Sequence, residues 1–159
     1  MPFITQGSHT KNIRHKIVVV DDDLTALHMV RDALKPFYEV YPAPSGAKMF
    51  EILGHVTIDL IILDIEMPEM DGYEVLGILK GNPNTASIPI VFLTSRADDA
   101  TELVGFDIGA VDYVAKPFSE PLLLKRIANQ LLIVELRNEL LASQAALKEC
   151  ADKLAAAEK

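Results

Sequence analysis

Several polar residues in this sequence each follow a short apolar run, and their side-chain types could act together. Three adjacent carboxylates, Asp21, Asp22 and Asp23, come directly after VVV, although three like charges in a row repel one another. Three later apolar runs end in the same way, with Asp64 after IDLIIL, Thr94 after IPIVFL and Lys116 after VDYVA. If these residues meet in space, the repulsion between the carboxylates must be relieved by a cation.

The apolar runs alternate with segments of helical periodicity, which predicts an α/β fold. The predicted strands are 17–20, 40–41, 58–64, 88–95 and 111–116, and the predicted helices are 24–37, 45–54, 73–79, 100–108 and one from about 119 onward. Runs that lack polar alternation are typical of parallel strands covered by helices on both faces. Because sites in such sheets lie beyond the carboxyl ends of the strands, the polar residues are expected on one rim.

The chemistry that such a rim supports is phosphoryl transfer. Lys116 supplies one positive charge, and a hard divalent ion such as Mg²⁺ binds carboxylate oxygens. Asp22 and Asp64 are the favoured ligands, with Asp21 orienting the ion or binding it through water. An ion held in this way keeps positions for phosphate oxygens. Asp64 would then be the nucleophile, Lys116 a cation for the phosphoryl oxygens, and Thr94 a hydrogen-bond donor.

Four sequence blocks together are similar to a known family. In order, VVVDDD, LIILDIEMPEMDGYEVL, PIVFLTSR and GAVDYVAKPF resemble the receiver domain of two-component response regulators, over roughly residues 16–132. The resemblance implies a flavodoxin-like, doubly wound, five-stranded parallel sheet in the order 2-1-3-4-5. It also implies that Asp64 accepts a phosphoryl group from a sensor histidine kinase or a phosphotransfer protein.

The resemblance further assigns roles around the site. Asp21 and Asp22 match the acidic pair of the family, with Asp22 the more direct Mg²⁺ ligand, and the backbone carbonyl of Glu66 matches a third protein ligand. Such a receiver labels itself and later loses the label, so it is not expected to be an enzyme that turns over a substrate.

The switch residues are implied by the same resemblance. Thr94 matches the hydroxyl that bonds the phosphoryl group, Lys116 matches the salt-bridging lysine, and Tyr113 stands where the family has an aromatic switch. The Lys116–Pro117 bond resembles one that is cis in the family. Asp23 has no role in the family and is predicted to cap the helix that starts at Leu24.

Two charged residues flank the predicted site, because Glu66 lies two positions after Asp64 and Arg96 two positions after Thr94. Their opposite charges could pair above the rim, where water approaches the phosphoryl group. The hypothesis is that this pair prolongs the lifetime of the aspartyl phosphate.

Two other functions remain open. The pattern Asp21-x-Asp23-x-Thr25 also resembles phosphatases of the haloacid-dehalogenase type, but that interpretation gives Asp64 no role and finds no acidic pair after Lys116. The second alternative is a receiver-shaped scaffold that dimerises independently of phosphorylation. Turnover of a small phosphoester would distinguish the phosphatase, since a receiver labels itself only once.

The C-terminal segment is helical in pattern from about Ser119 to the end. Ile133, Leu140, Leu147 and Leu154 recur every seven residues, followed three positions later by Leu136, Ser143, Cys150 and Ala157. This heptad pattern predicts a parallel two-stranded coiled coil, and therefore a homodimer that passes the signal to an output module. The predicted organisation is a flexible lead-in at 1–14, a receiver domain at 15–132 and a coiled-coil extension at 133–159.

Composition narrows the classes of partner and compartment. The formal net charge of −8 argues against direct nucleic-acid binding. The single cysteine fits a reducing compartment, and no apolar run reaches the length of a membrane span. These features predict a cytoplasmic protein that does not contact a membrane.

Overall fold

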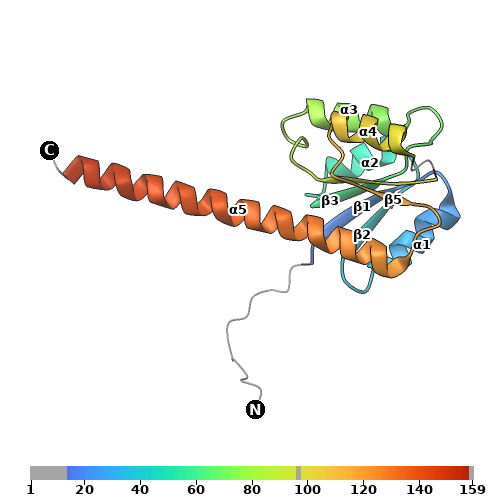
Figure 1. Ribbon diagram of the computed structural model, residues 1–159, viewed down its shortest axis with the longest axis horizontal. Coiled ribbons are helices and arrows are strands. Elements are labelled where there is room, and N and C mark those ends of the chain that lie inside the picture. Colours follow the sequence, from blue (N-terminus) through green and yellow to red (C-terminus); the bar gives the residue numbers. More distant parts are fainter. Residues whose placement is uncertain (1–13, 96–97, 158–159) are drawn as a thin grey trace, which may run out of the picture.

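The computed structural model describes residues 14–95 and 98–157 and is built around a parallel sheet (Figure 1). Its strands are β1 Lys16–Val20, β2 Glu39–Ala43, β3 Leu60–Leu63, β4 Ile90–Thr94 and β5 Asp112–Ala115. They are ordered β2-β1-β3-β4-β5, and all neighbouring pairs are parallel. The predicted flavodoxin-like strand order is therefore confirmed.

Five helices cover the two faces of the sheet. They are α1 Leu24–Leu34, α2 Gly46–Leu53, α3 Gly72–Gly81, α4 Asp99–Ile108 and α5 Glu120–Ala157. Helices α1 and α5 lie on one face, and α2, α3 and α4 lie on the other (Figure 1). Each face has its own apolar cluster of buried side chains. Burial on both faces explains why the strands are apolar without alternation.

The strand register brings the predicted site residues to one rim. Val20 pairs with Leu63, so the residues that follow β1 and β3 are neighbours. Thr94 pairs with Ala115, so Lys116 leaves the sheet beside the end of β4. The backbone amide of Asp64 donates to the carbonyl of Val20 at 2.9 Å, which fixes the two loops against each other.

The two predicted helix caps are present in the structure, but α1 ends earlier than predicted. Asp23 and Ser45 each accept a hydrogen bond from a backbone amide in the first turn of α1 and α2, at 3.0 and 3.2 Å, as predicted. The predicted extension of α1 to Phe37 is wrong, because the helix ends at Leu34. Pro36 explains this end, since proline has no amide hydrogen with which to continue the helix.

Three strands are shorter than predicted, and one of them is β5, which covers Asp112–Ala115 rather than 111–116. Strands β3 and β4 begin at Leu60 and Ile90 rather than at positions 58 and 88. The carboxylate of Asp59 accepts a hydrogen bond from the backbone amide of Lys16 at 2.7 Å, so the side chain meets that amide just before β3 begins. Pro89, just before β4, has no amide to donate.

Helix α5 belongs to the domain in its first part and extends away from it in the second (Figure 1). Leu123, Ile127 and Leu131 are buried against the sheet, whereas nearly every later residue of the helix is exposed. The imidazole of His15 lies 2.7 Å from the Glu135 carboxylate and so ties the helix to the start of β1. In residues 14–95 and 98–157, no helix combines the length and the apolar character that a membrane crossing requires.

Candidate functional site

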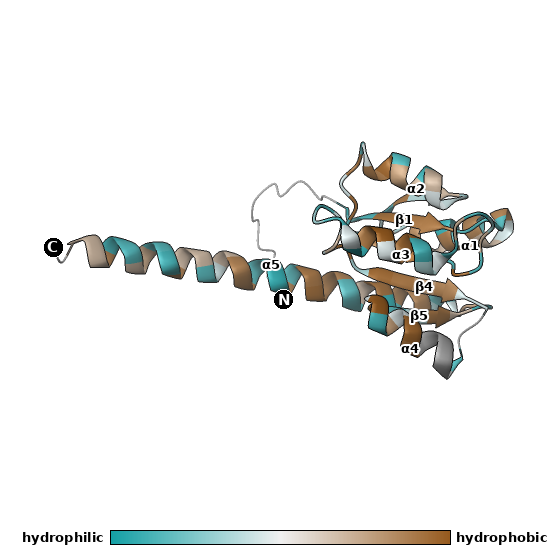
Figure 2. Cartoon of the chain, turned by 90° about the horizontal axis from the view of Figure 1, so that it is seen from above, coloured by the Kyte–Doolittle hydropathy of each residue, from teal (hydrophilic) through white to brown (hydrophobic). Residues whose placement is uncertain are grey.

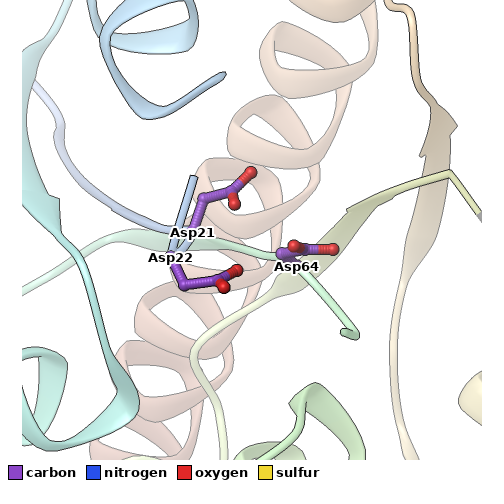
Figure 3. Close-up of side chains that lie close together, drawn as sticks. All are labelled: Asp21, Asp22 and Asp64. Atoms are coloured by element: carbon purple, nitrogen blue, oxygen red, sulfur yellow. The ribbon is translucent and has the colours of Figure 1, made fainter. Parts of the chain in front are cut away.

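Three carboxylates meet at the carboxyl ends of β1 and β3. Each of Asp21, Asp22 and Asp64 offers an oxygen, and these oxygens lie within 4.8 Å of one another (Figure 3). Asp21 is 2% exposed and Asp64 is 6% exposed, whereas Asp22 is open to solvent. Buried carboxylates must be paired or hold a cation, so this arrangement is a candidate metal and phosphate site.

Lys116 joins this cluster from the loop after β5. Its ammonium lies 2.5 Å from an oxygen of Asp21 and 3.5 Å from an oxygen of Asp64. Its backbone amide donates to the carbonyl of Thr94 at 2.9 Å, and the peptide bond between Lys116 and Pro117 is cis. The sequence predicted a lysine at this rim, but the stronger contact with Asp21 was not predicted.

Burial and the neighbouring charges shift the pKa values of Asp64 and Lys116. Burial and the neighbouring Asp21 carboxylate raise the pKa of Asp64 to about 6, although Lys116 and the backbone of Glu66 oppose the shift. Burial alone lowers the pKa of Lys116, but its hydrogen bond to Asp21 and the charges of both carboxylates outweigh burial and leave the pKa raised. A carboxyl group whose pKa is near 6 is mostly ionised at neutral pH and becomes protonated as the pH falls below that value.

The other residues that the sequence predicted around the site differ in where the structure places them. Thr94 is fully buried at the end of β4. The side chain of Glu66 is exposed, while its backbone interacts with Asp64. Asp23 instead caps α1. Arg96 lies outside the described residues, so its predicted pairing with Glu66 remains a prediction.

The carboxylate cluster fits a hard divalent cation. Three carboxylates and one ammonium leave two negative charges, which matches the charge of Mg²⁺. All of the side-chain donors are oxygens, the ligand type that Mg²⁺ prefers. Among the residues that the structure describes, the one group of three or more acids, histidines or cysteines with ligand atoms close enough to hold a metal ion is Asp21, Asp22 and Asp64.

One residue that supports the site was not singled out in the sequence. Gly72 begins α3, where the loop after β3 folds back and the Gly72 amide donates to the carbonyl of Ile65 at 2.7 Å. A Cβ at position 72 would lie 2.5 Å from the backbone oxygen of Asp64 and 2.7 Å from Cα of Ile65. The glycine therefore lets α3 approach the backbone that carries Asp64.

Substitution of Gly72 by alanine is expected to destabilise the protein by about 1–3 kcal/mol, the usual cost of overpacking. It should also weaken Mg²⁺ binding, because the clash displaces the segment that carries Asp64. Chemical denaturation and a Mg²⁺ titration measure the two effects. The matched control is Gly77→Ala in α3, where a Cβ meets nothing within 4 Å. Equal stability of the two variants would contradict the prediction.

Comparison with known proteins gives one consistent family. A model of the response regulator receiver domain matches residues 17–128. A probable cyclic di-GMP phosphodiesterase of Vibrio cholerae is 45% identical over 115 residues, which are 72% of this chain and 26% of that protein. A probable transcriptional regulator, ycf27 of Cyanidium caldarium, is 36% identical over 126 residues, which are 79% of this chain and 49% of that protein.

Solved structures agree with the sequence relatives. A response regulator from Chloroflexus aurantiacus superposes with a TM-score of 0.71 at 35% identity, covering 75% of this chain and 98% of that one. The chemotaxis response regulator CheY4 of Vibrio cholerae gives a TM-score of 0.69 at 29% identity, with coverage of 74% and 98%. The chain thus spans a whole receiver structure but only 26% and 49% of the two sequence relatives.

Proposed function

The chain belongs to the response regulator receiver family of two-component systems, and on this basis we propose that Asp64 accepts a phosphoryl group from a histidine kinase or a phosphotransfer protein. The observation that supports this proposal best is the position of Lys116. Its ammonium lies between Asp21 and Asp64, at 2.5 and 3.5 Å, on the rim where the three carboxylates meet. A cation placed beside a nucleophilic carboxylate is what phosphoryl transfer requires.

We propose that Asp21, Asp22, Asp64 and the backbone carbonyl of Glu66 hold Mg²⁺. The ion would supply positive charge for the phosphoryl oxygens and neutralise the carboxylates. Asp22 is the exposed member of the cluster, so it is the ligand that solvent and ion reach first. Asp21 would also orient Lys116, whose ammonium donates a hydrogen bond to it.

The transfer step forms one bond and breaks another. A carboxylate oxygen of Asp64 attacks the phosphorus atom, and the bond between phosphorus and the imidazole nitrogen of the donor breaks, with its electron pair remaining on that nitrogen. Lys116 would stabilise the negative charge on the transferred oxygens. The Thr94 hydroxyl would donate a hydrogen bond to the bound phosphoryl group, and Tyr113 would respond to that change as the switch.

The experiment that tests this function is labelling with acetyl phosphate and Mg²⁺. A receiver should take up one phosphoryl group per chain and then stop. A phosphatase of the haloacid-dehalogenase type would instead release phosphate continuously from a small phosphoester. Labelling alone does not identify a scaffold, whose dimerisation would be the same with or without the phosphoryl group.

Mg²⁺ affinity is expected to fall as the pH drops through about 6, by about tenfold for each further pH unit, because the ion must displace the proton of Asp64. The sign follows from the raised pKa, since Asp64 is ionised above that pH and protonated below it. Calorimetric titration with Mg²⁺ between pH 5 and 8 measures the effect. Asp22→Asn should weaken Mg²⁺ binding at every pH, but the affinity of this variant should still fall as the pH drops through about 6. Equal affinity across this range would exclude Asp64 as a ligand.

We further propose that residues 133–159 form a coiled-coil extension of a receiver domain at 15–132, through which two copies dimerise. A helix turns by about 100° per residue, so the row at Ile133, Leu140, Leu147 and Leu154 lies roughly opposite the face that the domain buries. Leu147 is 69% exposed and Leu154 is 63% exposed. A second copy could therefore cover this row without colliding with the receiver.

This outward leucine row also favours the scaffold alternative, in which dimerisation does not depend on phosphorylation. Beyond the domain, α5 carries a mixture of hydrophobic and hydrophilic residues along its length (Figure 2). Sedimentation with and without the phosphoryl label would distinguish the two functions. A dimer whose formation is unaffected by the label would favour the scaffold.

A further inference from the structure

Tyr113 is held between two aromatic rings beneath α4. The side chain is 5% exposed, and its ring centroid lies 5.2 Å from that of Phe92 on β4 and 5.1 Å from that of Phe106 on α4. Phe106 itself is 44% exposed, so it covers the tyrosine on one side and meets solvent on the other. The ring of Tyr113 thus separates the sheet from the outer surface of α4.

The tip of this ring occupies the space where Gly105 has no side chain. A Cβ built on Gly105 would lie 1.5 Å from the phenolic oxygen of Tyr113 and 2.6 Å from Cζ of the same ring. These distances are far below van der Waals contact, and the ring is enclosed by Phe92 and Phe106. A small shift of the ring cannot relieve such an overlap.

The backbone of Gly105 gives no other reason for glycine. Gly109, at the end of α4, has a φ of +128°, in the region that favours glycine, but Gly105 lies inside the helix and does not have a positive φ. Alanine is a better helix former than glycine at an ordinary helical position. The missing side chain is therefore explained by the ring of Tyr113 and not by the helix.

We propose that Gly105 and Phe106 form a seat on α4 that admits the ring of Tyr113, so that the residue at position 105 decides whether the ring can lie inside. The seat rests on the proposed function only in that Tyr113 is the switch of that function. Phe106 contacts Tyr113 and is also exposed, so the seat lies beside the exposed apolar residues of α4. These residues include Leu103 and Val104.

The first test measures the accessibility of Tyr113 by nitration with tetranitromethane, followed by peptide mass spectrometry. In the unphosphorylated parent, Tyr113 should be nitrated more slowly than the less buried Tyr41. Gly105→Ala should raise the nitration rate of Tyr113 several-fold and leave that of Tyr41 unchanged. Gly77→Ala, where a Cβ meets open space, should change neither rate. Continued protection of Tyr113 in Gly105→Ala would overturn the proposal.

The second test is a double-mutant cycle that remains informative if Gly105→Ala is poorly stable. In the parent, Gly105→Ala should lower the thermal midpoint. In a Tyr113→Ala background the same substitution should not lower it, because the ring that causes the overlap is absent. An equal loss in both backgrounds would show that the glycine serves something other than Tyr113, and the proposal would fall.

These outcomes are separable from the proposed phosphorylation. Nitration and unfolding use the unphosphorylated protein, so they test the seat even if Asp64 takes no label. Labelling of Gly105→Ala with acetyl phosphate should still occur, since neither Gly105 nor Tyr113 is among the grouped carboxylates or their lysine. A parent that cannot be labelled would refute the proposed function and leave the seat intact.

Discussion

Asp64→Asn is expected to abolish labelling by acetyl phosphate, because an amide oxygen does not form the acyl phosphate that a carboxylate forms. The variant should remain folded. Burial and Asp21 make the charged form of Asp64 unfavourable, as its pKa of about 6 indicates, and a neutral amide of the same shape removes that repulsion. The expected result is thus a thermal midpoint no lower than that of the parent, with no phosphoryl label detectable by mass spectrometry.

The control for this prediction is another acid of the same loop region. Asp23→Asn removes a charge two positions from Asp21, but asparagine caps a helix as well as aspartate does. This variant should therefore fold and accept label at the parental level. A label that persists in Asp64→Asn would contradict the assignment, and its position in the digested peptides would identify the true acceptor.

The positions of the site residues were predictable because each of them directly follows an apolar run in the sequence. Each apolar run ends in a polar residue, and parallel strands covered on both faces bring their carboxyl ends to one edge. The paired ends of β1 and β3 then bring Asp21 and Asp64 together without any further information. Caps were equally accessible, since Asp23 and Ser45 act on backbone amides only a few residues away.

Features that depend on three-dimensional approach were not predictable. The sequence contains eight glycines, and nothing local distinguishes Gly72 or Gly105 from Gly77. The difference appears only when Gly72 lies against the backbone of Asp64 and Gly105 against the ring of Tyr113. The preference of Lys116 for Asp21 over Asp64 likewise depends on side-chain geometry across three loops.

Charge on the leucine row of α5 is expected to convert the proposed dimer to a monomer. Leu147→Lys/Leu154→Lys replaces two exposed leucines of the row by a residue of similar helix propensity, so the helix itself should persist. Two such losses in each of two chains remove about 6–12 kcal/mol of apolar burial. A dimer of micromolar affinity is held by only about 8 kcal/mol, so it should dissociate. Analytical ultracentrifugation at micromolar concentration measures the change.

The matched control adds the same two charges to the opposite side of the helix. Ala145 and Ala156 lie about half a turn away from the leucine row, so Ala145→Lys/Ala156→Lys should leave the dimer intact. Removal of residues 135–159 should act like the leucine substitutions, because it deletes Leu140, Leu147 and Leu154 together. If the leucine variant and the truncated chain both sediment as dimers, the receiver domain holds the two copies together, and α5 must have another partner. If the alanine control and the leucine variant both become monomers, the added charge alone explains the dissociation of the dimer, and the leucine row is not its interface.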